Sequence, residues 1–233
     1  MADTVVPFGA SDLFALPAAF NEQNSSTTVT RERDVNLDAS GDLACESAEF
    51  NVTTNYSSTY QYCGTTLVTD ALTEKVFTEF GDVLDSKLVD SIEVSFGNKT
   101  QPEITISGHN HSVNPHLVDT LRHFDISSIV PDAGGVGVPA VTGVTVAATN
   151  APQSASISAA FEHMDVEGAD GDHFGGENRT CIVTLSMSGV GPASGITLAA
   201  PWVADDVGDE DANTDPDSFS IAAHQYVDFA AAP

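Results

Sequence analysis

The sequence predicts a mainly β protein: an antiparallel β-sandwich or barrel with long hairpins and one flanking α-helix at about residues 66–84. Two observations predict this fold. Apolar and polar side chains alternate along several short segments, which is the pattern of strands with one buried face. Turn-forming residues separate these segments, and only 66–84 carries a helical period. Strands joined by turns, with one inserted helix, favour antiparallel sheets.

The first strands are predicted from the N-terminal third of the chain. Residues 50–62 place Phe, Val and Tyr on one side and mostly Asn, Thr, Ser and Gln on the other, so we expect a half-buried strand there. Residues 28–37 are expected to be extended and to lead into a turn at 38–42. Residues 1–27 show no clear period and are predicted to form an N-terminal arm or irregular segment, whereas 28–233 are predicted to form one β-rich domain.

Residues 66–84 carry the helical period. Leu72, Val76 and Phe80 recur every four residues, and charged side chains fall away from this stripe. Gly81 is placed to end the helix, because glycine adopts the left-handed conformation that closes many helices. We expect one face of this helix to pack on the sheet.

After the helix the sequence returns to strand patterns. Alternating apolar residues on both sides of Gly97-Asn98 predict a hairpin at 88–107, and a second long hairpin is expected at 155–188. The stretch 165–173 resembles a calcium loop in composition but lacks its spacing, which favours a hairpin tip. The acidic stretch 204–217 is predicted to be a solvated loop.

The net charge excludes one class of function. The chain has 34 acidic and 7 basic residues, a formal charge of −27. Such a surface repels phosphate, so binding of nucleic acid through a basic patch is excluded. Solvation at high salt, a basic partner, a metal site and a surface that keeps nucleic acid from sticking remain as explanations. No run of 18 apolar residues occurs, so we expect no membrane anchor.

The chain has three cysteines, and an odd number far apart in sequence makes a disulfide framework unlikely and favours folding in a reducing cytosol. Cys45 and Cys63 could still pair across neighbouring strands. Cys63 and Cys181 lie in or next to strand patterns and are predicted to be small core residues. The sequence contains no G-x-S-x-G motif and no nucleotide-binding glycine loop. We therefore expect neither an enzyme nor a cofactor.

One histidine cluster is a candidate metal site. His109 and His111 are spaced so that a strand would present both rings on one face, and His116 could supply a third ligand. The alternative is that these histidines are polar loop residues at a subunit contact.

Four stretches carry a family resemblance: RERDVNLD at 31–38, NVTTNYSSTYQYCGT at 51–65 with the helix after it, ITISGHNHSVNPH at 104–116, and the hairpin FEHMDVEGADGDHFGGEN…CIVTLSM at 161–187. In their order and style they resemble virion proteins of tailed bacteriophages, and are most similar to a major tail tube protein. The resemblance covers roughly residues 28–230.

The resemblance implies a homo-oligomer located in the virion tail and made in the host cytoplasm. Copies of the chain would form hexameric rings that stack into a tube, contact other virion proteins and let DNA pass without specific binding. The hairpin 88–107 is the expected lumen or assembly element, with Glu93, Asn98, Lys99 and Glu103 as its polar residues. The alternatives are a capsid decoration or receptor-binding protein, and a metal-dependent enzyme that uses His109, His111 and His116.

Overall fold

The computed structural model describes residues 13–73, 75–77, 83–84, 87–111, 124–132, 134–171, 173–210 and 216–227. Strands account for 62% of the structure. In chain order the elements are β1 (Phe20–Glu32), β2 (Val35–Leu37), β3 (Leu43–Glu46), β4 (Phe50–Tyr62), α1 (Leu67–Thr73), β5 (Val83–Leu84), β6 (Lys87–Gly97), β7 (Thr100–His111), β8 (Val144–Val146), β9 (Ala151–Glu167), β10 (His173–Val190), the 3-10 helix η2 (Ala193–Gly195), β11 (Ile196–Leu198), β12 (Val203–Glu210) and β13 (Ser218–Val227).

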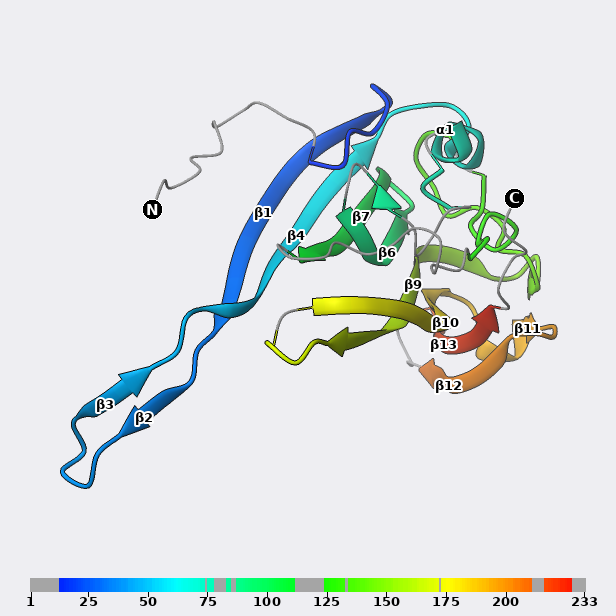
Figure 1. The fold of residues 1–233 in the computed structure, drawn as a ribbon. Helices are drawn as coiled ribbons and strands as arrows, with labels where there is room; N and C mark the ends of the chain where they lie inside the picture. The colour runs from blue at the N-terminus through cyan, green and yellow to red at the C-terminus, as the bar shows by residue number, and fades with distance from the viewer. Residues whose placement is uncertain are drawn as a thin grey trace.

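One large antiparallel sheet organises the protein (Figure 1). Its strands follow the order β1-β4-β7-β6-β9-β10-β13-β12, with β5 paired to β6, and β8–β11 and β2–β3 form two small separate sheets. The predicted mainly β, antiparallel fold with long hairpins and one flanking helix is confirmed. The described part of the chain contains no helix long and apolar enough to cross a bilayer.

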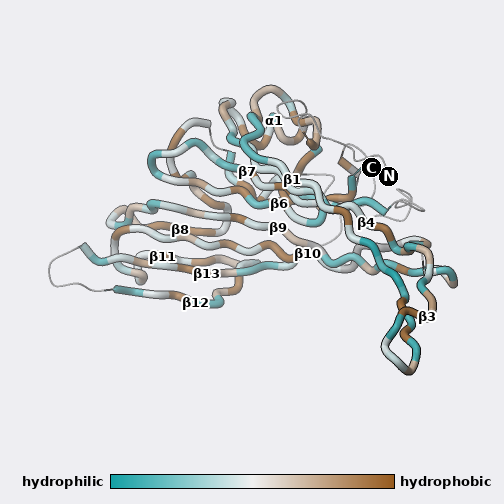
Figure 2. Tube along the Cα trace, turned by 90° about the vertical axis from the view of Figure 1, so that its left-hand side faces the viewer, coloured by the Kyte–Doolittle hydropathy of each residue, from teal (hydrophilic) through white to brown (hydrophobic). Residues whose placement is uncertain are grey.

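The two faces of the large sheet differ because side chains alternate along each strand. One face is apolar and packs into a core with α1 and the segments around Phe124 and Trp202. Ile104 and Ile106 of β7 are fully buried there, as the alternation predicts. The other face carries small polar side chains. Figure 2 shows this alternation as changes of hydropathy along the strands.

The predicted helix at 66–84 is too long. α1 ends at Thr73, and Val83–Leu84 is a strand that pairs with β6. Lys75 adopts a positive φ of 64°, its N–H donates to the carbonyl of Leu72, and the next N–H, of Val76, donates to the carbonyl of Ala71. This pair of bonds is a Schellman closure built on a non-glycine residue. The proposed stop at Gly81 lies outside the described residues.

Two predicted boundaries are also corrected. β1 begins at Phe20 and pairs with β4 along its length. Residues 20–27 of the expected N-terminal arm or irregular segment at 1–27 therefore belong to a strand of the sheet. Residues 203–210 of the expected acidic loop form β12, an edge strand paired with β13. The predicted turn at 38–42 is present, with the carboxylate of Asp38 accepting the N–H of Ser40 at 2.8 Å.

The segment that projects from the body is the far end of the β1–β4 ribbon, which ends in β2–β3 (Figure 1). We call residues 23–48, all of them exposed, the arm. Arg33 forms ion pairs with Glu46, at 2.7 Å, and with Glu49. These contacts hold the two strands of the arm together.

Candidate functional site

The polar face of the large sheet is covered by short hydroxyl side chains. We call it the hydroxyl face; it comprises Ser57, Thr59, Ser91, Ser95, Thr105, Ser107, Ser154, Ser156, Ser158, Thr184, Ser186 and Ser188. The register aligns these residues into rows that cross five strands, of which one runs through Thr59, Thr105, Glu93, Ser158 and Thr184.

Neighbouring hydroxyl groups bond to one another across the strands. Ser91 and Ser107 lie 2.6 Å apart, and Ser154 and Ser188 lie 2.8 Å apart, between their Oγ atoms. Short side chains in mutual hydrogen bonds leave a face that is flat, polar and uncharged at these positions. This face was not predicted from the sequence, although serine or threonine occupies every second residue of 154–158 and 184–188.

The structure places all four predicted hairpin residues. Glu93 and Glu103 are exposed on the hydroxyl face, and Ser156 donates a 2.6 Å hydrogen bond to Glu93. Asn98 and Lys99 form the exposed turn between β6 and β7. Both edges of this hairpin are occupied, by β4 and by β9, so it offers a face and a tip for assembly rather than a free edge.

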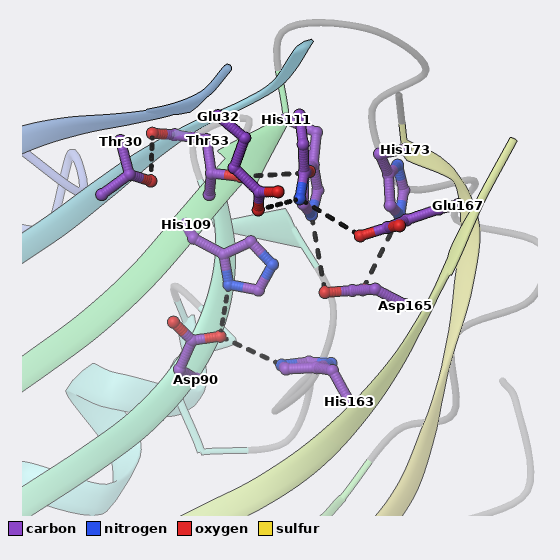
Figure 3. Close-up of polar contacts among 11 residues, drawn as sticks. Thr30, Glu32, Thr53, Asp90, His109, His111, His163, Asp165, Glu167 and His173 are labelled. Carbon is purple, nitrogen blue, oxygen red and sulfur yellow. Dashed lines mark hydrogen bonds and ion pairs between the residues drawn. The ribbon is translucent and has the colours of Figure 1, made fainter. Parts of the chain in front are cut away.

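A cluster of histidine and aspartate side chains lies between the β6–β7 hairpin and the β9–β10 hairpin (Figure 3). The β6–β9 ladder ends at Ser91–Ala160, whereas β7 continues to His111 and β9 to Glu167. The cluster fills this split in the sheet. Its members come from four strands: Asp90 on β6, His109 and His111 on β7, His163 and Asp165 on β9, and His173 on β10.

Asp90 connects two of the histidines. Its Oδ1 lies 2.7 Å from Nδ1 of His109 and 3.1 Å from Nε2 of His163. The β6–β7 register shifts between Val89 and Ser91, so Asp90 occupies an irregular position of the kind that redirects a side chain. This shift turns the Asp90 carboxylate toward the two rings.

The charges of Asp90 and His109 stabilise each other. Burial alone would raise the pKa of Asp90, but the hydrogen bonds and charges of His109 and His163 outweigh it and lower that pKa. Burial alone would lower the pKa of His109, but its bond to Asp90, with a smaller contribution from Asp165, raises it. The pair therefore favours an ionised carboxylate beside a protonated ring when no other cation is present.

A second group adjoins the first and shares His109. Asp165 places one carboxylate oxygen 3.7 Å from Nε2 of His111 and the other 3.7 Å from Nε2 of His173. The rings of His111 and His173 stack with centroids 3.8 Å apart. Together with His173, the group of His109, His111 and Asp165 lines a cavity of about 240 Å³. The remaining wall comes from Asn51, Thr53 and Asn55 of β4 and from Glu167.

The predicted metal ligands are thus partly brought together. His109 and His111 lie in one cluster, on a strand rather than in a loop, and His116 lies outside the described residues. Sequence reasoning missed Asp90, His163 and Asp165. The repeated spacing His109-x-His111 and His163-x-Asp165 was an available signal, because each pair projects from one face of its strand.

The cysteines do not contribute to either site. Cys181 is buried in the core, as predicted, and burial raises the pKa of its thiol to about 12. Cys63 is exposed, which corrects the prediction that it is a core residue. Both Cys45 and Cys63 are free thiols.

Comparison of the sequence with protein-family models and with curated proteins found no match. The features of the structure that bear on function are the arm, the hydroxyl face and the His/Asp cluster.

Proposed function

We propose that this protein is a structural virion subunit whose copies assemble, through the arm, into stacked rings that form the tail tube of a bacteriophage. The observation that carries the proposal is the arm: all residues from 23 to 48 are exposed, including the apolar side chains of Val35, Leu37 and Leu43. A two-stranded ribbon is marginally stable by itself, and exposed apolar side chains on it favour a partner surface.

The unpaired sheet edges support a partner that is a copy of the same chain. β1 is an edge strand of thirteen residues, and beyond β4 it has no further neighbour in the described sheet. Such an edge presents unpaired backbone groups that other strands can bind. The opposite edge, β12, carries Asp205, Asp206, Asp209 and Glu210, and like charges of this kind discourage strand pairing. The β1 side is therefore the better candidate for assembly.

The hydroxyl face suits the lining of a tube through which DNA moves. Its hydroxyl groups carry no charge, and Glu93 and Glu103 add negative charge among them. Among the described residues of this face there is no lysine or arginine to pair with phosphate, and Lys99 lies in the turn at its end, so DNA would be retained only weakly. At physiological salt the repulsion extends about 8 Å from each carboxylate, so it acts close to the wall.

Removal of the arm tip tests this proposal. Asp34 and Ser47 already face each other, with the N–H of Ser47 donating to the carbonyl of Asp34 at 2.8 Å. An Asn-Gly turn in place of residues 35–46 should close the shortened ribbon without disturbing the body.

Electron microscopy of the purified full chain at high concentration should show six-fold rings or tubes, and the shortened variant should show neither while it melts at the same temperature. Compact trimers would instead favour a decoration or receptor-binding protein. Equal assembly of both proteins, or a wild type that stays monomeric under these conditions, would contradict the proposal.

A further inference from the structure

We infer that Asp90, His109 and His163 form a binding site for one divalent transition metal ion of the zinc class. Each residue comes from a different strand of the sheet, and the three side chains meet where the β6–β9 ladder ends (Figure 3). One donor atom from each residue lies within 4.8 Å of the other two.

Two of the three donor distances are close to those of a tetrahedral site, and the third lies within 4.8 Å. Bonds of about 2.0–2.1 Å from zinc to nitrogen or oxygen place adjacent donors about 3.3 Å apart. The oxygen of Asp90 lies 2.7 Å from the His109 nitrogen and 3.1 Å from the His163 nitrogen. An ion would thus require shifts of well under 1 Å from these two contacts, and its binding would release any protons on the ligand atoms.

The chemistry of the donors selects the class of ion. Two imidazole rings and one carboxylate suit Zn²⁺, Co²⁺ and Ni²⁺, whereas Mg²⁺ and Ca²⁺ prefer sites made only of oxygen. The three protein donors leave the fourth position of a tetrahedral ion to water. The formal charge of −27 also favours accumulation of cations near the protein.

The burial of the two histidine donors separates this cluster from surface pairs of histidine and aspartate, whereas Asp90 is 32% exposed. The side chains of His109 and His163 are 10% and 9% exposed, so their rings are held in place by packing. His224 and Asp205 form a pair with the same 2.7 Å distance, but they are 28% and 48% exposed and no third donor group includes them among the described residues. That pair serves as a matched control.

The metal would join two hairpins that the backbone ladder leaves apart. Asp90 and His109 belong to the β6–β7 hairpin, and His163 lies on β9 beyond its last pairing with β6. An ion held by all three would therefore stabilise this end of the sheet, near the root of the arm, where Asn51 contacts both Glu32 and Glu167.

Cobalt binding to the full-length protein tests the inference. Titration of chelator-treated protein at pH 8 and high salt should show visible absorption typical of tetrahedral Co²⁺ that saturates at about one equivalent. Excess Zn²⁺ should remove the absorption, and excess Mg²⁺ should not. Zn²⁺ should also raise the melting temperature. A wild-type protein that binds neither Co²⁺ nor Zn²⁺ in a stoichiometric amount would overturn the inference, whatever the variants do.

Four variants locate the ion. His163→Ala should weaken Zn²⁺ binding by more than the roughly 10- to 100-fold that changes around metal ligands cost, and Asp90→Asn, which keeps the size of the side chain, should do the same if the alanine variant does not fold. His224→Ala should bind as the wild type does. Loss of binding in His111→Ala with full binding in His163→Ala would overturn this assignment and place the ion in the neighbouring group of His109, His111 and Asp165.

Discussion

The apolar side chains of the arm should contribute directly to self-association. We consider the replacement of Val35, Leu37 and Leu43 by serine. These side chains are 50%, 61% and 59% exposed, so each has about half of its surface left to bury against a partner. Complete burial of such a side chain from water stabilises by about 1.5–3 kcal/mol, which leaves about 1 kcal/mol or more for each of the three.

A contact between subunits rarely buries all of the remaining surface. If it buries half to two-thirds, the three replacements together cost about 2 kcal/mol for each arm contact. Because 1.4 kcal/mol corresponds to a factor of ten, the concentration at which assembly begins should rise by about 30-fold. The free energy of unfolding of the monomer should change by less than about 0.5 kcal/mol, since the replaced side chains are exposed and lie outside the core.

Light scattering and sedimentation velocity, measured over a range of protein concentrations, give the onset of assembly, and urea denaturation gives the stability. Val136→Ser is the matched control, because Val136 is 58% exposed but lies in a loop of the body. An unchanged onset for the triple variant, or an equal shift for Val136→Ser, would refute the reasoning that the arm is the assembly element.

Three further predictions concern stability and are measured by urea denaturation. In the presence of a chelator, Asp90→Asn should cost about 1.5–3 kcal/mol near pH 5–6 and progressively less at higher pH, because it removes a charged group that is hydrogen-bonded to His109 and lies 3.1 Å from His163. Tyr62→Phe should cost about 1–3 kcal/mol, since the buried hydroxyl donates to Asp70 at 2.6 Å and accepts the N–H of Thr66 at 2.9 Å. Gly189→Ala should cost about 1–3 kcal/mol, because its Cβ would overlap the carbonyl oxygen of Ala151.

The direction of the pH effect follows from the two pKa shifts. The pKa of His109 is raised on folding, so its contribution is complete below the unfolded value of about 6.5 and is lost as the pH rises through the folded value. The pKa of Asp90 is lowered, so its contribution is complete above about pH 4 and is lost as the pH falls through the folded value. A stability difference between wild type and Asp90→Asn that did not change from pH 5.5 to pH 9 would contradict this account.

Tyr62→Phe and Gly189→Ala each have a matched control variant. Tyr226 is 65% exposed, so Tyr226→Phe should leave stability unchanged; equal effects of the two tyrosine changes would contradict the role given to the Tyr62 hydroxyl. Adding Cβ to Gly175 meets no atom within 4 Å. Gly189→Ala should therefore be clearly less stable than Gly175→Ala, and the opposite order would show that the backbone near Ala151 yields easily.

Local patterns were sufficient to predict most of the strands and the buried face of those with clear alternation, but not the start of β1 or the edge strand β12. Ile104 and Ile106 alternate with polar residues, and both are buried on the face that the alternation indicates. The hairpin around Asn98 was also predictable, because a two-residue turn between alternating segments fixes the register. The helix was predicted too long, since the four-residue spacing of Leu72 and Val76 continues beyond the point where Lys75 closes the helix.

The candidate sites could not be predicted from local sequence patterns alone. His109 and His111 were identified from their spacing, but their neighbours Asp90, His163 and Asp165 are up to 56 residues away from them in the chain. Hydroxyl groups could be counted in the sequence, yet only the pairing order β4-β7-β6-β9-β10 joins them into one face.

The sequence by itself determined most of the strands, the apolar side of those with clear alternation, and a surface charge that repels phosphate. These are properties of neighbouring residues and of composition, so they need no knowledge of the fold. Tertiary structure decided the end of the helix, the projection of the arm and the meeting of Asp90 with two histidines. These depend on strand order and on a register shift of one residue, which arise from packing between segments far apart in the chain.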